Sequence, residues 1–134
     1  MKEKKVSSVF KSDIALVWDK ITNHEDYKWR EGIRESVKID ENSYYEIDSN
    51  GQRTDYTILE NRPMEFYKLS MENDKTKSTV DYIFHKKEQG CEVEVIQETD
   101  FKNAWTGLFA GTFIDMGKLQ LRYLYLVKKA LGEL

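Results

Sequence analysis

The 134-residue chain has few of the residues that mark several common classes of protein. Its single cysteine, Cys91, cannot form a disulfide within the chain, which favours a reducing compartment, so we expect a cytoplasmic protein. The only proline, Pro63, leaves no Pro-rich linker, and no repeat or low-complexity tract divides the sequence. With this length, the sequence predicts one domain over residues 1–134.

Excess basic charge and long apolar stretches are also missing. Twenty-one Lys and Arg against 24 Asp and Glu give a net charge of −3, whereas nucleic-acid-binding domains usually present a basic face. The most apolar segment, residues 108–114, is too short to cross a bilayer, and the first residues lack the apolar stretch of a signal peptide. We therefore expect neither nucleic-acid binding nor an integral membrane position.

Sequence motifs for metal binding and for nucleophilic or phosphate chemistry are absent as well. The two histidines, His24 and His85, form no zinc-binding pattern with Cys91, and no Gly-rich phosphate loop or Gly-x-Ser-x-Gly occurs. We expect His24 to be solvated or to cap a helix end, His85 to face solvent, and Cys91 to be buried and inert. No metal and no cofactor are expected.

Hydrophobic periodicity first predicts a strand over residues 4–10 and then helical structure. Ser12 is a suitable N-cap for a helix whose apolar residues recur at i, i+3, i+4 and i+7, namely Ile14, Val17, Trp18 and Ile21. A second short helix is predicted over residues 25–30, closed by Gly32.

From residue 32 to residue 101 the apolar period is two. Asn50-Gly51 is a strong hairpin signal, and other short polar turns separate alternating segments, which predicts an antiparallel meander. The apolar phase, expected to face inward, contains several polar-tipped or polar residues: Glu35, Tyr45, Tyr56, Tyr67, Tyr82, Gln97 and Thr99. A slip of one residue would reverse the facing of any strand, and Glu35 is the residue most open to that change.

The last segment returns to helical periodicity, with one broad apolar face from about Trp105 to Gly132, roughly 40 Å in length. A sheet and a helix that each have one apolar face must cover each other. The predicted fold class is therefore α+β, a curved antiparallel sheet of about six to seven strands wrapped around a long C-terminal helix, with two short helices after the first strand.

Seventeen aromatic residues in so short a chain, eight of them tyrosines, indicate more than ordinary core packing. A buried hydroxyl without a partner costs about 1–3 kcal/mol, so a semi-polar cavity would accommodate the inward tyrosines better than a close-packed core. The alternative is that these groups pair with one another or reach the sheet edge. The predicted ligand-binding residues are Trp29, Glu35, Tyr45, Tyr56, Tyr67, Tyr82, Gln97, Trp105, Phe109, Phe113 and Met116.

Several segments, in this order along the chain, resemble the START-like superfamily, which includes polyketide cyclase/dehydrase and lipid-transport families and relatives of the birch-pollen allergen. They are Val17-Trp18-Asp19-Lys20-Ile21-Thr22, Tyr27-Lys28-Trp29, Tyr56 to Glu60 before Pro63, Tyr82-Ile83-Phe84, and Gly90-Cys91-Glu92-Val93. The resemblance covers the whole chain and implies a helix-grip fold with a cavity between the sheet and the last helix. It says little about function, because this scaffold carries binders, carriers and enzymes.

Three functions are compatible with these observations. The first is non-enzymatic binding of a small hydrophobic or aromatic ligand, by a monomer or homodimer. The second, suggested by the resemblance, is a metal-free cyclase or dehydrase in which Glu35 moves a proton α to a carbonyl while tyrosine hydroxyls stabilise the oxyanion. The third is a protein-interaction module of the kind used in chaperone regulation, for which the sequence shows no partner surface.

Overall fold

A computed structural model of the chain describes residues 2–103 and 115–134. Within these residues, strands and helices follow one another as β1 (Lys2–Phe10), α1 (Ile14–Thr22), β2 (Ile33–Asp40), β3 (Ser43–Asp48), β4 (Arg53–Arg62), β5 (Phe66–Glu72), β6 (Thr76–Lys86), β7 (Cys91–Phe101) and α3 (Met116–Ala130). The order agrees with the predicted strand, helix, meander and C-terminal helix.

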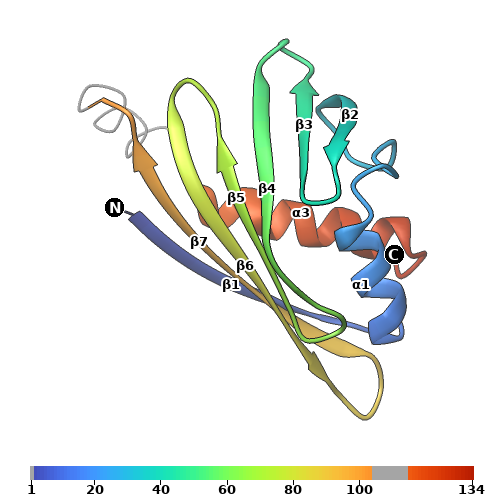
Figure 1. Cartoon of the computed structure of the whole chain (residues 1–134). Coiled ribbons are helices and arrows are strands. Elements are labelled where there is room, and N and C mark those ends of the chain that lie inside the picture. Colours follow the sequence, from blue (N-terminus) through green and yellow to red (C-terminus); the bar gives the residue numbers. More distant parts are fainter. Residues whose placement is uncertain (1, 104–114) are drawn as a thin grey trace.

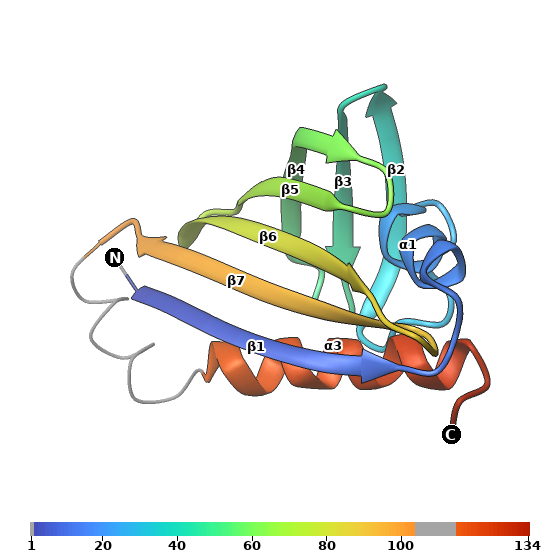
Figure 2. The ribbon, with the colours of Figure 1, turned by 90° about the horizontal axis from the view of Figure 1, so that it is seen from below.

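The seven strands form one antiparallel sheet with the order β1-β7-β6-β5-β4-β3-β2. The sheet is curved, and α3 runs along its concave side, below β1 in the second view (Figures 1 and 2). Helix α1 lies beside the C-terminal part of α3 (Figure 1). The predicted α+β helix-grip fold is therefore confirmed. None of the helices described is both long and apolar enough to cross a membrane.

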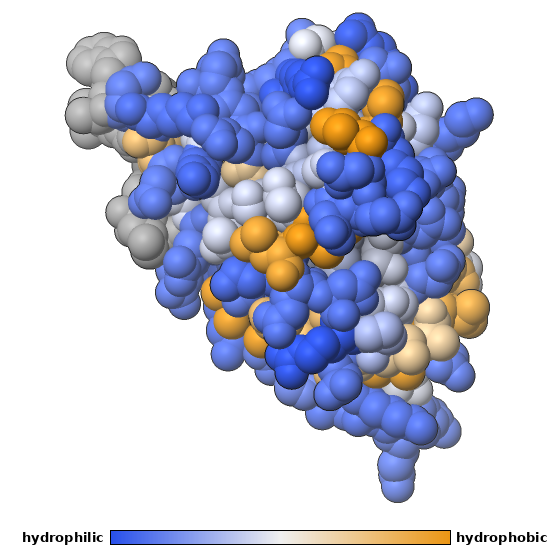
Figure 3. All heavy atoms as spheres, viewed as in Figure 1, coloured by the Kyte–Doolittle hydropathy of each residue, from blue (hydrophilic) through white to orange (hydrophobic). Residues whose placement is uncertain are grey.

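Strict alternation of buried and less buried residues explains how β5, β6 and β7 form the centre of this sheet. The inward side chains pack with α1 and α3 into one core, which includes Phe10, Val17, Tyr67, Val80, Phe84, Val93, Val95, Leu124 and Val127. The convex face, turned toward the viewer in Figure 3, is mostly hydrophilic with small separate apolar spots. One face of the sheet is thus buried against the helices, and the other is exposed to solvent.

The segment between β1 and β2 differs from the prediction in two details. Asp13, not Ser12, caps α1, its carboxylate accepting from the Ala15 amide at 3.0 Å. The hydroxyl of Ser12 instead donates to Glu133, at 2.7 Å. Residues 25–30 form turns rather than a second helix, because so short a segment cannot offset the cost of helix nucleation without a packed apolar face.

The predicted facing of β2 and β3 is wrong. A register irregularity between Ile33 and Glu35 shifts the phase of β2, so that Ser36 lies opposite the buried Glu46 and Val37 lies opposite Tyr45. A bulge adds one residue to a strand and therefore exchanges its two faces. In β3, which pairs with β4 without a register shift, Tyr44 and Glu46 face inward, whereas the hydrophobic pattern favoured Tyr45 and Ile47.

The C-terminal helix is described from residue 116. Asp115 is its N-cap, accepting from the Lys118 amide at 3.1 Å. The helix was expected to run from about Trp105 to Gly132; its last helical residue is Ala130, and Gly132 follows with φ +78°. The prediction of one continuous helix over this range is wrong, because Asp115 has an extended backbone (φ −101°, ψ 99°) and caps a helix that begins at Met116. The predicted start near Trp105 lies outside the residues that the structure describes.

Substitution of Gly90 tests how closely the β6–β7 turn packs against Phe10. It has φ +75°, and a Cβ there would lie 1.8 Å from the Phe10 carbonyl oxygen, whereas Gly51 has φ +82° and open space around it. Gly51→Ala should cost about 1–2 kcal/mol of unfolding free energy, and Gly90→Ala clearly more, because a backbone clash adds to the same strain. Urea unfolding measures both, and equal losses would show that the turn tolerates the clash.

Candidate functional site

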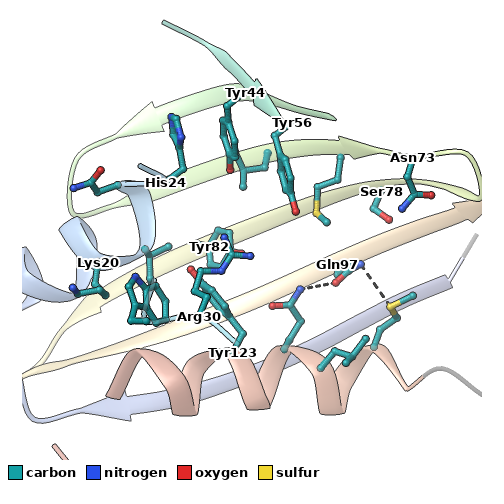
Figure 4. A pocket seen from close by; sticks show the side chains of 18 of the residues that line it. Lys20, His24, Arg30, Tyr44, Tyr56, Asn73, Ser78, Tyr82, Gln97 and Tyr123 are labelled. Atoms are coloured by element: carbon teal, nitrogen blue, oxygen red, sulfur yellow. Dashed lines mark hydrogen bonds between the residues drawn. The ribbon is translucent and has the colours of Figure 1, made fainter. Parts of the chain in front are cut away.

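A cavity of about 320 Å³ lies between the concave face of the sheet and α3 (Figure 4). Its size is at the lower end of the range of about 300–1,000 Å³ found for small-molecule sites. The described residues that line it come from the end of α1 and the turn after it, from strands β3 to β7 with the β5–β6 turn, and from α3. They are Lys20, Ile21, Asn23, His24, Asp26, Trp29, Arg30, Tyr44, Tyr56, Leu69, Met71, Asn73, Thr76, Ser78, Tyr82, Gln97, Met116, Leu119, Gln120 and Tyr123.

One cross-strand row of the sheet supplies much of the cavity wall. Tyr44 pairs with Tyr56, Tyr56 with Met71, Met71 with Ser78, and Ser78 with Thr99. Directly opposed residues share one face of a sheet, so the aromatic, thioether and hydroxyl groups of this row form a continuous strip. The wall therefore changes from aromatic at β3 to polar at β7.

Helix α3 supplies the opposite wall. Met116, Leu119, Gln120 and Tyr123 recur at i, i+3, i+4 and i+7, which places them on one helix face. This spacing turns a polar amide and a tyrosine toward the sheet along with two apolar side chains.

Three rings stack in parallel at the aromatic end of the cavity (Figure 4). The centroids of His24 and Tyr44 are 3.8 Å apart with planes at 1°, and those of Tyr44 and Tyr56 are 4.7 Å apart with planes at 3°. The Nδ1 atom of His24 is buried with no hydrogen-bond partner, and burial lowers the pKa of this imidazole. His24 is thus part of the cavity wall, and the expectation of a solvated or capping role is wrong.

A buried ion pair lies next to the ring stack. The Arg30 guanidinium donates to both carboxylate oxygens of Glu46, at 2.5 and 3.2 Å. Arg30 lines the cavity, whereas the Glu46 side chain is only 3% exposed and contacts the guanidinium from β3. The carboxylate raises the pKa of Arg30 against the effect of burial, so the guanidinium stays charged. Arg30 also lies 5.8 Å from the ring centroid of Tyr123.

Amides and hydroxyls form a small network at the other end of the cavity. Gln120 donates to the Gln97 carbonyl oxygen at 2.6 Å, and Gln97 donates to Thr99 at 3.2 Å. The hydroxyls of Ser78 and Thr99 are 2.9 Å apart. Figure 4 shows Gln97 and Ser78 on this side, away from the ring stack. These groups pair with one another, as the alternative interpretation of the sequence proposed, and Ser78, Gln97 and Gln120 still border the cavity.

The tyrosines around the cavity remain protonated at neutral pH. Burial raises the pKa of Tyr56 and of Tyr82 well above the ordinary value, and raises that of Tyr123 to about 12. The negative charge of Glu46 raises the pKa of Tyr56 further. Their hydroxyls can therefore donate as well as accept hydrogen bonds.

Several residues predicted from the sequence line the cavity: Trp29, Tyr56, Tyr82, Gln97 and Met116. Tyr67 faces inward as predicted but is only 1% exposed and packs in the core, with its ring 5.8 Å from that of Trp18. Trp105, Phe109 and Phe113 lie outside the described residues.

Glu35 and Tyr45 do not belong to the site. Glu35 is exposed beyond the register irregularity of β2, and Tyr45 lies on the convex face with Arg53 3.8 Å above its ring. A carboxylate and a ring on that face cannot reach the cavity, so the proton-transfer role considered for Glu35 is wrong.

Sequence reasoning missed Arg30, Tyr44 and Glu46 as site residues. The apolar phase of this strand was assigned to Tyr45 and Ile47, and Glu46 was not considered as a site residue. The signal that could have found it is the opposite charge of Arg30 in the preceding turn. Gln120 and Tyr123 were placed on the apolar helix face, but their polar groups were not assigned to a site.

The other residues considered for chemistry lie away from the cavity. Cys91 is buried, which raises its thiol pKa to about 11, and this agrees with the predicted inert thiol. His85 lies on the convex face, 3.1 Å from Glu94. With Glu92 these two form a group of possible metal ligands, but Glu92 and Glu94 also pair with lysines.

The Arg30–Glu46 pair should contribute strongly to stability. Arg30→Met leaves a buried carboxylate without its partner and should cost about 3–5 kcal/mol of unfolding free energy. Arg53→Met, which breaks the exposed pair with Asp55 on the convex face, should cost less than about 1 kcal/mol. Chemical denaturation at pH 7 compares them, and similar losses would contradict the buried pair.

Tyr123 should make the free energy of unfolding decrease at alkaline pH. Because its pKa is raised from 10.0 to about 12, the folded protein keeps a proton that the unfolded chain loses, and stability should fall as pH rises from 10 to 12. Tyr123→Phe should make this fall shallower, whereas Tyr125→Phe on the exposed side of α3 should leave it unchanged. Thermal melts across this range give the result, and identical slopes in all three proteins would refute it.

Comparison with known proteins is informative only at the level of structure. No protein family matches the sequence, and no curated protein matches it. Among solved structures, a conserved protein from Geobacillus kaustophilus has a TM-score of 0.78 at 14% identity, over 98% of this chain and 96% of that one. A protein of unknown function from Staphylococcus aureus has a TM-score of 0.72 at 15% identity, over 99% and 96%.

A third similar structure is DynU16, a protein in the dynemicin biosynthetic locus. Its TM-score is 0.75 at 10% identity, and the match covers 98% of this chain but 48% of DynU16. At these identities the three comparisons establish a shared fold, while function must be argued from the side chains of the cavity.

Proposed function

We propose that this protein binds a small, planar, largely apolar ligand in the cavity between the sheet and α3, and that it does not transform the ligand. The observation that carries the proposal is the wall itself, a 320 Å³ cavity bordered by a parallel ring stack at one end and a polar network at the other. Aromatic walls with a few placed polar groups are typical of small-molecule sites.

The fold supports this proposal without specifying the ligand. The helix-grip architecture and the resemblance of the sequence to the START-like superfamily agree with a carrier or binder that encloses its ligand. The similar structure DynU16 comes from the dynemicin biosynthetic locus, which is compatible with a protein that binds a small organic molecule. Membership of the START-like superfamily is part of the proposal.

The geometry favours binding over cyclase- or dehydrase-type catalysis. In the alternative considered from the sequence, a carboxylate in the cavity accepts a proton from the bound substrate. Glu35 is exposed outside the cavity, and both oxygens of Glu46 accept from Arg30. Asp26 does line the cavity, but it forms an ion pair with Lys20 at 2.8 Å. No carboxylate among the described residues is thus placed as a general base.

Native mass spectrometry of the purified protein is the first test. We expect a co-purified small molecule, or, after its removal, binding of the planar probe 2-naphthol by calorimetry with a stoichiometry of one. Protein without a co-purified molecule and without measurable 2-naphthol binding would refute the proposal.

A pair of tyrosine variants tests the position of the site. Tyr56→Leu keeps an apolar side chain but removes the planar face and hydroxyl, and it should weaken 2-naphthol binding about tenfold, equivalent to about 1.4 kcal/mol. Tyr45→Leu makes the same change on the convex face and should leave the affinity within a factor of about two. Equal effects of the two variants would place binding elsewhere.

A further inference from the structure

The charges around the cavity balance each other. Two cationic side chains line it, Lys20 and Arg30, and each is paired with one carboxylate. Lys20 Nζ lies 2.8 Å from Asp26, and Arg30 contacts both oxygens of Glu46. Figure 4 shows Arg30 beside Tyr82 and Tyr123, and Lys20 farther from them, on α1. Two positive and two negative groups leave this part of the cavity without net charge.

The remaining lining residues do not disturb this balance. The lowered pKa of His24 leaves its imidazole neutral at pH 7, and the tyrosines stay protonated. The polar residues of the other end are amides and hydroxyls. Residues 104–114, which the structure does not describe, contain no ionisable side chain in their sequence. Whatever their position, they cannot add a charge.

An ionic ligand would therefore have to break a pair inside the cavity. A carboxylate that reached Arg30 would displace Glu46, which is 3% exposed and would be left buried without its partner. An ammonium group that displaced Lys20 from Asp26 would compete with a cation already in place. Leaving Glu46 buried without its partner is costly, so the first exchange is unfavourable. The second exchange brings no gain, because Lys20–Asp26 is an exposed pair, with the Asp26 side chain 47% exposed, and such pairs contribute little.

Neutral hydrogen-bonding groups have partners in the same cavity. Within the described residues, the hydroxyls of Tyr82 and Tyr123 have no hydrogen-bond partner. Gln120 donates to Gln97 through its amide nitrogen, and its carbonyl oxygen does not take part in that contact. Phenol hydroxyls can donate to a carbonyl or accept from a hydroxyl, and an amide oxygen accepts. These groups suit oxygen substituents on a ring.

We propose that the ligand is a neutral planar molecule that carries hydroxyl or carbonyl oxygens, and that the paired charges exclude carboxylates and ammonium compounds. This inference rests on the proposed binding function and specifies its ligand class. It separates the protein from carriers of free fatty acids, whose carboxylate needs an unpaired cation.

Two probes of nearly identical shape test the charge preference in the unmodified protein. At pH 7, 2-naphthol is neutral and 2-naphthoate is an anion. Calorimetry should show 2-naphthol binding at least about tenfold more tightly. Equal or tighter binding of 2-naphthoate would overturn the ligand class while leaving the binding function intact. If neither probe binds, the binding function itself fails.

A charge variant tests the cause of the preference. Glu46→Gln leaves the Arg30 guanidinium without its carboxylate and should reverse the preference, with 2-naphthoate affinity rising at least about tenfold. Asp55→Asn removes the carboxylate of the Arg53 pair on the convex face and should change neither affinity. An unchanged preference in folded Glu46→Gln protein would overturn the role of the pair.

Two further variants make the test independent of the stability of Glu46→Gln. The double variant Arg30→Met with Glu46→Gln removes both charges and should keep the preference for 2-naphthol. Asp26→Asn frees Lys20 from its partner and should shift the preference toward 2-naphthoate without any change at Glu46. A shift in the double variant, or none in Asp26→Asn, would contradict the charge-balance argument.

Discussion

A carboxylate can stay inside a protein only if a cation and hydrogen-bond donors replace the water that it loses. Glu46, 3% exposed on β3, meets this condition through Arg30. The pair fixes the turn after α1 against the sheet, and this turn brings His24 and Trp29 to the cavity. The aromatic end of the cavity therefore depends on this ion pair between a turn and a strand. Without the pair, neither the inward facing of Glu46 in β3 nor the position of the turn after α1 would be favourable.

The sequence predicts the parts of the fold where hydrophobic pattern and geometry agree. Strands β5 to β7 alternate strictly, so their inward residues, such as Tyr82 and Gln97, could be assigned correctly. The pattern failed at β2 and β3, where adjacent tyrosines offer a ring to both faces and a bulge shifts the phase. At these strands the inward face is determined by the ion pair of Arg30 with Glu46, which are sixteen residues apart in the sequence. A local hydrophobic period cannot reveal such a pair.

The sequence predicted the chemical character of the cavity but not the contacts that form it. Inward tyrosines indicated a semi-polar interior, but the stack of His24 on Tyr44, and the pairing of Gln97 with Gln120, depend on contacts between distant segments. Proteins of 10–15% identity share the fold, so the architecture does not select the ligand. The cations that line the cavity of this chain are already paired with carboxylates, and this pairing favours neutral ligands over ionic ones.

The most direct measurement is a crystal structure of the protein soaked with 6-bromo-2-naphthol, in which the anomalous signal of bromine locates the ligand. The account predicts a bromine peak inside the cavity between Tyr56 and α3, with the Arg30–Glu46 pair intact and the ligand hydroxyl within hydrogen-bond distance of Tyr82, Tyr123 or Gln120. Bromine peaks on the surface alone, with the cavity closed by its own side chains, would contradict it.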